Sequence, residues 1–313
     1  ATQIVMGSVL YPLFKLIWGG DEEMAWRTVT IVPAVVAFIT GIIIIRGSDD
    51  CPKGYYKDLK RTGEMPEVSA AASFRTGSYN LNTWILYIQY ACCFGVELTV
   101  NNAAVSYFVD RFGLAIETAS AIASIFGFMN LFARGFGGYF SDKAMGRFKM
   151  RGRILIQAAC LILEGVCIFI FAQTASLAAS IVMLTIFSIF VQAAEGSTYG
   201  IVPYVDSKAT GAISGIVGAG GPSGAVSFGL IFRAYPNDPI FAFNVMAGVV
   251  LGSGVLSLLF NLKGHRNLLF GKDRDIALET LALPVSDETG PDVNDDNKKN
   301  GSDAYVNEVE ANA

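Results

Sequence analysis

Charged side chains are scarce in this sequence, and histidine is nearly absent. Only 16% of the 313 residues are charged, whereas an ordinary soluble domain carries roughly 25%. The sequence has no GxxxxGK[ST] loop for nucleotide phosphates, and it has no nucleophile at a recognisable spacing from a base. These absences argue against a primary pump and against an enzyme, and they predict no metal, no cofactor and no nucleic-acid partner.

The single histidine, His265, lies close to Lys263 and Arg266, just beyond the last apolar run. A contact with a lipid headgroup explains this position better than a metal ligand or a proton relay does. The basic cluster therefore indicates membrane lipid, rather than a metal ion, as the neighbour of this segment.

Long apolar runs are what the sequence has instead of charge. Hydrophobic residues make up 52% of the chain, and runs of about 20 apolar residues, the length that crosses a ~30 Å hydrocarbon core, recur along it. We therefore expect an all-α, polytopic membrane protein. The apolar segment 1–18 starts without Met and lacks the features of a signal peptide, so it is interpreted as the remnant of a span. Complete spans are predicted at 28–46, 83–107, 117–140, 153–173, 177–200, 209–232 and 239–262.

Lysine and arginine are concentrated in alternate connections between these spans. The segment 46–82 contains six of them, the short turn 141–153 contains five, and the tail 263–313 contains six. Positive charge collects on the cytoplasmic side of membrane proteins. The bias predicts that these connections and the C-terminus are cytoplasmic.

Arg134 is the one basic residue deep within a complete predicted span. An arginine at the centre of a membrane helix costs about 2.5–3.5 kcal/mol on insertion scales, so such a residue normally lines a substrate path. Its planar and permanently charged guanidinium suits a planar oxyanion. The alternative is a structural ion pair with a buried carboxylate, for which the candidates are Glu97, Glu164 and Glu195.

Glycine is concentrated in the predicted span 209–232. One interpretation of these glycines is close helix packing, because small residues spaced three and four apart let helices approach each other. The other interpretation is that the glycines both pack helices and line a substrate path, because glycine leaves room for a small ligand beside the backbone. Pro222 also removes a helical hydrogen bond to the turn near Gly218 and frees a carbonyl in mid-membrane. The glycines of this span are Gly211, Gly215, Gly218, Gly220, Gly221, Gly224 and Gly229.

Three stretches of sequence carry a family resemblance. They are GIVGAGGPSGA at 215–225, FGVELTVNNAAVSYFVDRFGL at 94–114 and MNLFARGFGG at 129–138. The first resembles the glycine-rich signature of the nitrate/nitrite porter family in the major facilitator superfamily, and the other two resemble its plant and algal members. The opening ATQ is similar to the end of the matching signature in the first half of the family.

The resemblance extends from residue 1 to about residue 262 and implies a domain organisation of twelve spans in two six-helix halves. Residues 1–46 would be the end of the N-terminal half, with part of the fifth span and the sixth. Residues 47–82 would be a cytoplasmic central loop, and 83–262 the C-terminal six-helix half. The cytoplasmic tail 263–313 turns acidic and polar at residue 273, a composition that predicts disorder.

The resemblance also assigns roles to single residues. Arg134 matches the arginine of the eighth span that binds nitrate. In the family, aromatic residues of the seventh span sandwich the anion. The residues of this chain that could match them are Tyr87, Tyr90 and Phe94. Their alternative role is packing against lipid or the core. The residues that match the glycine motif are Gly218, Gly220 and Gly221.

Two features depart from the family pattern or extend it. Pro222 stands where the family usually has Asn, which removes an amide side chain near the path. The string GYFSDKAMGR at 138–147 resembles the superfamily's cytoplasmic loop signature, with one extra residue before Gly146. In that loop Asp142 and Arg147 are gating candidates. Asp142 can cap a helix end or form an ion pair near it, and such a contact can hold the six-helix half in one conformational state.

The resemblance implies a secondary transporter of the plasma membrane. It would take up nitrate, with nitrite as a second candidate substrate, together with protons, by rocking of two halves around a midplane site. Glu97 is the candidate for proton coupling, with structural hydrogen bonding as its alternative role. Some plant and green-algal members need a small single-span partner. A nonconducting nitrate receptor is the alternative function, and a membrane-embedded enzyme is a weaker one, because the spans contain almost no convergent polar side chains.

Overall fold

The computed structural model describes residues 4–51, 54–62, 69–236 and 238–273. Within them the regular secondary structure is helical throughout. In the described part of the chain, seven helical segments are long and apolar enough to cross a membrane, which confirms the predicted all-α, multi-pass architecture. The acidic tail from residue 274 onward lies outside the described residues.

The first part of the chain contains short helices and one apolar span. A π-helical segment, Ile4–Leu10, leads directly into α1. The side chain of Asp21 caps α2 by accepting a hydrogen bond from the backbone N–H of Met24. The helices of this part are α1 (Tyr11–Ile17), α2 (Glu22–Val29), α3 (Ile31–Gly47), α4 (Tyr56–Arg61) and α5 (Ala70–Ser78).

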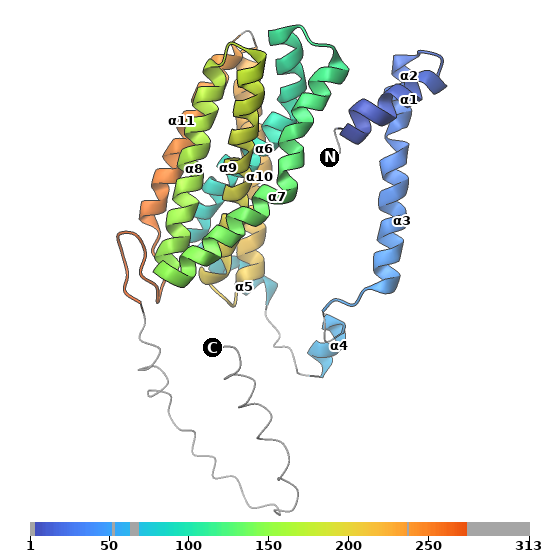
Figure 1. The fold of residues 1–313 in the computed structure, drawn as a ribbon. Coiled ribbons are helices and arrows are strands. Elements are labelled where there is room, and N and C mark those ends of the chain that lie inside the picture. The colour runs from blue at the N-terminus through green and yellow to red at the C-terminus, as the bar shows by residue number, and fades with distance from the viewer. Residues whose placement is uncertain (1–3, 52–53, 63–68, 237, 274–313) are drawn as a thin grey trace, which may run out of the picture. The chain divides into compact units, whose positions relative to one another are not determined.

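The rest of the described chain forms a bundle of six long helices (Figure 1). Asn80 caps the start of the first of them, and Gly113, in the left-handed conformation with φ 63°, ends it. The six helices are α6 (Leu81–Phe112), α7 (Ile116–Phe148), α8 (Met150–Gln173), α9 (Leu177–Ile201), α10 (Thr210–Ala234) and α11 (Pro239–Val255).

These helices extend beyond the predicted spans where charged residues are present. The predicted spans 83–107 and 117–140 lie inside the longer α6 and α7. The segment 141–153, predicted as a short turn, is helical except at Lys149, whose φ of 54° separates α7 from α8. The turn prediction was wrong because hydropathy marks where a helix leaves the bilayer, and not where the helix ends.

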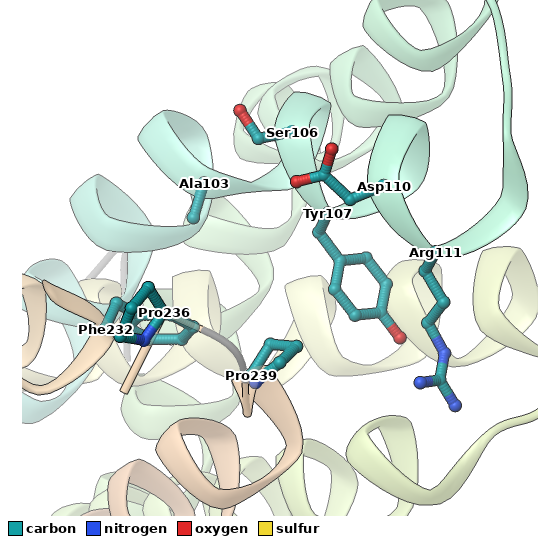
Figure 2. A pocket seen from close by; sticks show the side chains of 8 residues that line it. All are labelled: Ala103, Ser106, Tyr107, Asp110, Arg111, Phe232, Pro236 and Pro239. Atoms are coloured by element: carbon teal, nitrogen blue, oxygen red, sulfur yellow. The ribbon is translucent and has the colours of Figure 1, made fainter. Parts of the chain in front are cut away.

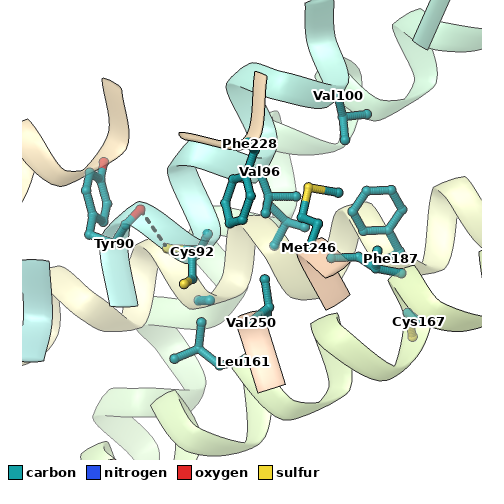
Figure 3. Packing of buried hydrophobic residues seen from close by; sticks show 14 of the residues in the cluster. Tyr90, Cys92, Val96, Val100, Leu161, Cys167, Phe187, Phe228, Met246 and Val250 are labelled. Carbon is teal, nitrogen blue, oxygen red and sulfur yellow. Dashed lines mark hydrogen bonds between the residues drawn. The ribbon is translucent and has the colours of Figure 1, made fainter. Parts of the chain in front are cut away.

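Apolar side chains from all six helices meet in the interior of the bundle, and Figure 3 shows part of this core. Val96 of α6 lies beside Phe228 of α10, and Val250 of α11 lies near Leu161 of α8. Buried packing of this kind holds membrane helices together through van der Waals contact, since lipid is as apolar as the side chains. The interior is therefore a packed core.

Glycines bring α6 and α10 into backbone contact. A Cβ atom placed on Gly95 would lie 2.8 Å from the backbone of Gly224, and one placed on Gly224 would collide with the carbonyl oxygen of Ala91. Small residues at such crossings allow helices to approach closely. The packing interpretation of the glycine-rich span is therefore confirmed at Gly224, and α10 is held directly against α6.

Candidate anion-binding site

Arg134 lies on α7 and contacts two carboxylates. Its Nη2 atom lies 3.3 Å from Oε2 of Glu97 on α6, and it also contacts Oε2 of Glu195 on α9. The side chain of Arg134 is 41% exposed, while both glutamates are buried. The ion pair that the sequence offered as an alternative role for Arg134 is therefore present, and it involves two acids at once.

The two glutamates differ in how their oxygens are satisfied. Oε1 of Glu97 accepts a hydrogen bond of 2.9 Å from Nδ2 of Asn130, so both of its oxygens have donors. Oε1 of Glu195 is buried and has no hydrogen-bond partner in the part of the chain that the structure describes. A buried polar atom without a partner is costly and calls for an explanation. Glu195 is therefore the less satisfied of the two acids.

Glu164, the third acid considered for Arg134, is placed elsewhere. It lies on α8, is fully buried, and makes no ion pair with the arginine. Neither of its carboxylate oxygens has a hydrogen-bond partner among the described residues. A buried carboxylate without partners is costly, and Glu164 does not serve as a counter-ion of Arg134.

Arg134 also has an unused donor. Nε is buried, and it has no hydrogen-bond partner within the described segments. An oxyanion that bridges Nε and Nη2 would satisfy this donor through the two-bond geometry that arginine offers to planar oxyanions. The arrangement can therefore bind a planar anion once Nη2 becomes free.

Phe94 is the predicted aromatic residue closest to this arrangement. The guanidinium carbon of Arg134 lies 5.9 Å from the centre of the Phe94 ring. Tyr90 follows, with its ring centre 5.3 Å from that of Phe94. Tyr87 differs, because its ring packs against Trp84 at 5.4 Å, nearer the start of α6. Phe94 therefore lies beside the arginine and Tyr90 packs against Phe94, whereas the ring contact of Tyr87 is with Trp84.

The three glycines of the motif each meet a different neighbour. A Cβ atom on Gly221 would overlap the ring of Phe94, and one on Gly220 would collide with the backbone carbonyl of Tyr87. A Cβ atom on Gly218 would lie 3.2 Å from the hydroxyl of Tyr199. Gly218 and Gly221 therefore border the aromatic residues of the site, while Gly220 is a packing residue.

Sequence reasoning missed Asn130 and Tyr199. Asn130 precedes Arg134 by four residues and Tyr199 follows Glu195 by four, so each shares a helix face with a charged site residue. The ring of Tyr199 contacts that of Tyr90 edge to face, with the ring centres 5.2 Å apart. A search for polar or aromatic residues four positions from each charge inside a span would have found both.

Two further glycines, also missed, place the acid of α9 beside the arginine of α7. A Cβ atom on Gly196 would collide with the carbonyl oxygen of Arg134. One on Gly137 would collide with the carbonyl oxygen of Ala193. The backbones of α7 and α9 therefore touch at the turn that carries Arg134 and Glu195.

Pro222 does not interrupt α10. The helix runs from Thr210 to Ala234 with the proline inside it, and the proline is exposed. Since proline has no N–H, the carbonyl of Gly218 receives no hydrogen bond from this position. The helix therefore tolerates the residue that departs from the family pattern.

The gating candidates are arranged differently from the sequence expectation. Asp142 is paired with Arg153 of α8, with Oδ1 2.6 Å from Nη2. The same guanidinium donates to Oγ of Ser141 at 3.3 Å and lies 5.4 Å from the ring centre of Tyr204. Arg147 is exposed and forms no ion pair among the described residues. Arg153, which was counted only as a loop charge, is therefore the partner of Asp142.

A cavity of about 490 Å³ lies near the far end of α6, away from Arg134 (Figure 2). Tyr107 and Arg111 project side by side from α6 there, and Arg111 donates a hydrogen bond of 2.9 Å to the backbone carbonyl of Thr174. None of the predicted site residues lines this cavity, and no described group of three or more His, Cys, Asp or Glu side chains is arranged to hold a metal ion. The cavity is lined by Ala103, Ser106, Tyr107, Asp110, Arg111, Phe232, Pro236 and Pro239.

Comparison with known proteins supports the family prediction. The chain is 38% identical over 232 residues to High affinity nitrate transporter 2.5 of Arabidopsis thaliana, covering 74% of this chain and 46% of that protein. It is 39% identical over 228 residues to Nitrate transporter 2.1 of Chlamydomonas reinhardtii, covering 70% and 42%. It is also 42% identical over 147 residues to Nitrate/nitrite transporter NrtP of a Picosynechococcus strain, covering 46% and 26%. The chain thus spans less than half the length of these relatives.

The family model for the Major Facilitator Superfamily matches residues 2–229, which is most of the chain. The seven apolar helices agree with that assignment, as does the similarity to proteins named for nitrate transport. The protein is a multi-pass membrane protein, and its chain belongs to the Major Facilitator Superfamily, where it is similar to the nitrate transporters.

Proposed function

We propose that the protein containing this chain transports nitrate across the membrane, with nitrite as a second candidate substrate. The observation that carries the proposal is the partly exposed side chain of Arg134 inside a helix long enough to span the bilayer. Two relatives are named nitrate transporters and a third is named for nitrate and nitrite. The match to a transporter family also points to a transporter rather than an enzyme.

The surroundings of Arg134 suit a small planar anion. The Phe94 ring lies beside the guanidinium, and Gly221 leaves the space that this ring occupies. A flat aromatic face and a planar fork of N–H donors recognise a planar trigonal oxyanion through both its face and its edge.

The proposed mechanism is alternating access coupled to protons. In this mechanism two halves rock around a midplane site, and the site opens to one side at a time. Arg134 joins three helices, because its partners lie on α6 and α9 while it lies on α7. Exchange of a carboxylate partner for nitrate would remove an ion pair between two of these helices. Nitrate binding would thereby be coupled to the relative movement of the helices.

The same proposal includes the orientation and the partners of the protein. The C-terminus would be cytoplasmic, and the protein would lie in the plasma membrane, as the distribution of lysine and arginine and the family resemblance indicate. Protons and membrane lipid are the further partners, together with a small single-span accessory protein, for which the family resemblance is the sole support.

Uptake of isotopically labelled nitrate by the full-length protein, in cells that lack their own nitrate uptake, tests this function. We expect uptake that saturates with nitrate concentration and that an uncoupler of the proton gradient abolishes. Binding of nitrate to the purified protein without uptake would favour the nonconducting receptor instead. Absence of both binding and uptake would contradict the proposed substrate.

A further inference from the structure

The cluster around Arg134 carries more negative than positive charge. One guanidinium faces two buried carboxylates, Glu97 and Glu195, and no other charged side chain forms an ion pair with the three within the described chain. An anion entering this cluster would add a further negative charge where charges interact strongly. Among the described residues, nitrate binding is therefore disfavoured in the charge state in which both acids are ionised.

The geometry of the contacts leads to the same restriction. An arginine offers two edges with paired donors, one formed by Nε and Nη2 and the other by Nη1 and Nη2, because Cδ blocks the third edge. Both glutamates contact Nη2 of Arg134. Nη2 belongs to both edges, so a planar oxyanion can form two parallel hydrogen bonds only after at least one carboxylate releases this atom.

The two acids are not equally suited to release it. Glu97 has a donor on each oxygen, Asn130 on one and Arg134 on the other, and these donors stabilise its charged form. Glu195 has Arg134 as its hydrogen-bond donor, and its second oxygen, Oε1, is buried without a partner in the described structure. Oε1 of Glu195 is therefore the oxygen in this cluster that is free to accept a proton.

We propose that Glu195 takes up a proton when nitrate binds, and that Arg134 then exchanges this carboxylate for the anion. The proton adds to Oε1 of Glu195 and neutralises it, the ion pair with Arg134 is lost, and nitrate takes its place on Nη2 and Nε. The entering anion replaces the charge that the proton removed, so the net charge of the cluster is unchanged. Glu97 stays charged as the fixed counter-ion. This inference rests on the proposed function and assigns its coupling residue.

The other titratable groups near Glu195 do not offer an equivalent site. Tyr90 of α6 and Tyr199 of α9 contact each other through their rings. A phenol is uncharged near neutral pH and so has no negative charge for a proton to neutralise. On α8, Glu164 is buried and forms no ion pair with Arg134. Along α10, the one charged residue is Arg233, in the last turn of the helix.

Nitrate affinity of the purified full-length protein, measured by isothermal titration at a series of pH values, tests the inference. If one proton binds with each anion, linkage requires the affinity to fall about tenfold for each pH unit above the range in which the acid titrates. In Glu195→Gln, a neutral side chain of the same size replaces the acid. We expect this variant to bind nitrate at high pH as tightly as the unmodified protein does at low pH, with no pH slope.

Glu164→Gln is the matched control, since it removes the other fully buried acid, which does not touch Arg134. It should retain the slope of the unmodified protein, and so should Glu97→Gln. A normal slope in Glu195→Gln would overturn the assignment, and so would a flat profile in Glu97→Gln alone. Glu195→Asp serves if the glutamine variant does not reach the membrane. Its shorter acid should keep the slope but shift its midpoint, and an unshifted profile would contradict the proposal.

The same titrations separate this inference from the function on which it rests. Nitrate binding by the unmodified protein without any pH slope would leave the proposed substrate intact and overturn the role of Glu195. Failure of the unmodified protein to bind nitrate at every pH would overturn the proposed substrate, and the inference would fall with it.

Discussion

The ring of Phe94 on α6 occupies the space that a side chain at Gly221 on α10 would fill. A Cβ atom built on Gly221 would overlap Cδ1 of the ring. The same ring lies 5.9 Å from the guanidinium carbon of Arg134. One glycine in the glycine-rich helix thus fixes where an aromatic side chain stands beside the charged group, although the three residues come from three helices.

The first prediction concerns this contact. Gly221→Ala should displace the Phe94 ring from its position beside Arg134, because the added methyl group would occupy the same space. Overpacking of a filled site costs about 1–3 kcal/mol and is relieved when side chains move. We expect the apparent nitrate affinity of the full-length protein to fall about tenfold. Gly229→Ala is the control in the same helix, since a Cβ atom there meets nothing within 4 Å. Equal effects of the two substitutions would show that the Phe94 contact does not matter.

The second prediction distinguishes anion binding by Arg134 from simple charge neutralisation. Arg134→Lys keeps the charge but loses the planar fork of donors. Loss of one charge-assisted hydrogen bond is worth about 1.5–3 kcal/mol, so apparent affinity should weaken roughly ten- to hundredfold. Arg134→Ala should be worse. Uptake kinetics normalised to surface protein provide the measurement, and near-normal affinity in the lysine variant would remove Arg134 from the binding site.

A third prediction follows from the continuity of α10 through Pro222. Pro222→Asn supplies a backbone N–H for the carbonyl of Gly218 and restores the side chain usual in the family. We expect transport at an equal surface level to be preserved or raised. The proline is exposed, so the new side chain has room. A large loss of transport would show that the missing hydrogen bond is itself needed for the transport cycle.

The fourth prediction compares two arginines at the junction of α7 and α8. The side chain of Arg153 is only 11% exposed and is paired with Asp142, whereas Arg147 is exposed and has no carboxylate partner among the described residues. Arg153→Gln leaves its former partner unpaired and removes a buried contact with Ser141 and Tyr204. It should lower the maximal uptake rate several-fold, and Arg147→Gln should leave the rate nearly unchanged. The opposite order would restore Arg147 as the gating residue.

The number and type of the spans could be predicted from sequence because they depend on local composition. A membrane helix satisfies its own backbone hydrogen bonds, so a sufficiently long apolar run determines that a span exists without reference to the rest of the fold. The same reasoning identified Arg134, since a charge inside an apolar run is visible in the run itself. Helix ends were less predictable: α7 continues to Phe148, well past the apolar part of its sequence.

The partners of these residues could not be predicted, because they depend on how each helix is rotated and where it crosses its neighbours. Glu97, Glu164 and Glu195 are equivalent as buried acids in the sequence, yet only Glu97 and Glu195 face Arg134. Tyr87, Tyr90 and Phe94 lie on one helix, yet only Phe94 lies beside the guanidinium.

The sequence by itself determined that the chain is a bundle of membrane helices with one arginine deep within an apolar span and a glycine-rich helix, since each of these is a property of a single segment. The tertiary structure decided that two acids share one nitrogen of that arginine, because α7 and α9 touch where Gly137 and Gly196 lack side chains. A charge pair between helices exists only at a particular crossing, and a crossing is set by the packing of both helices together.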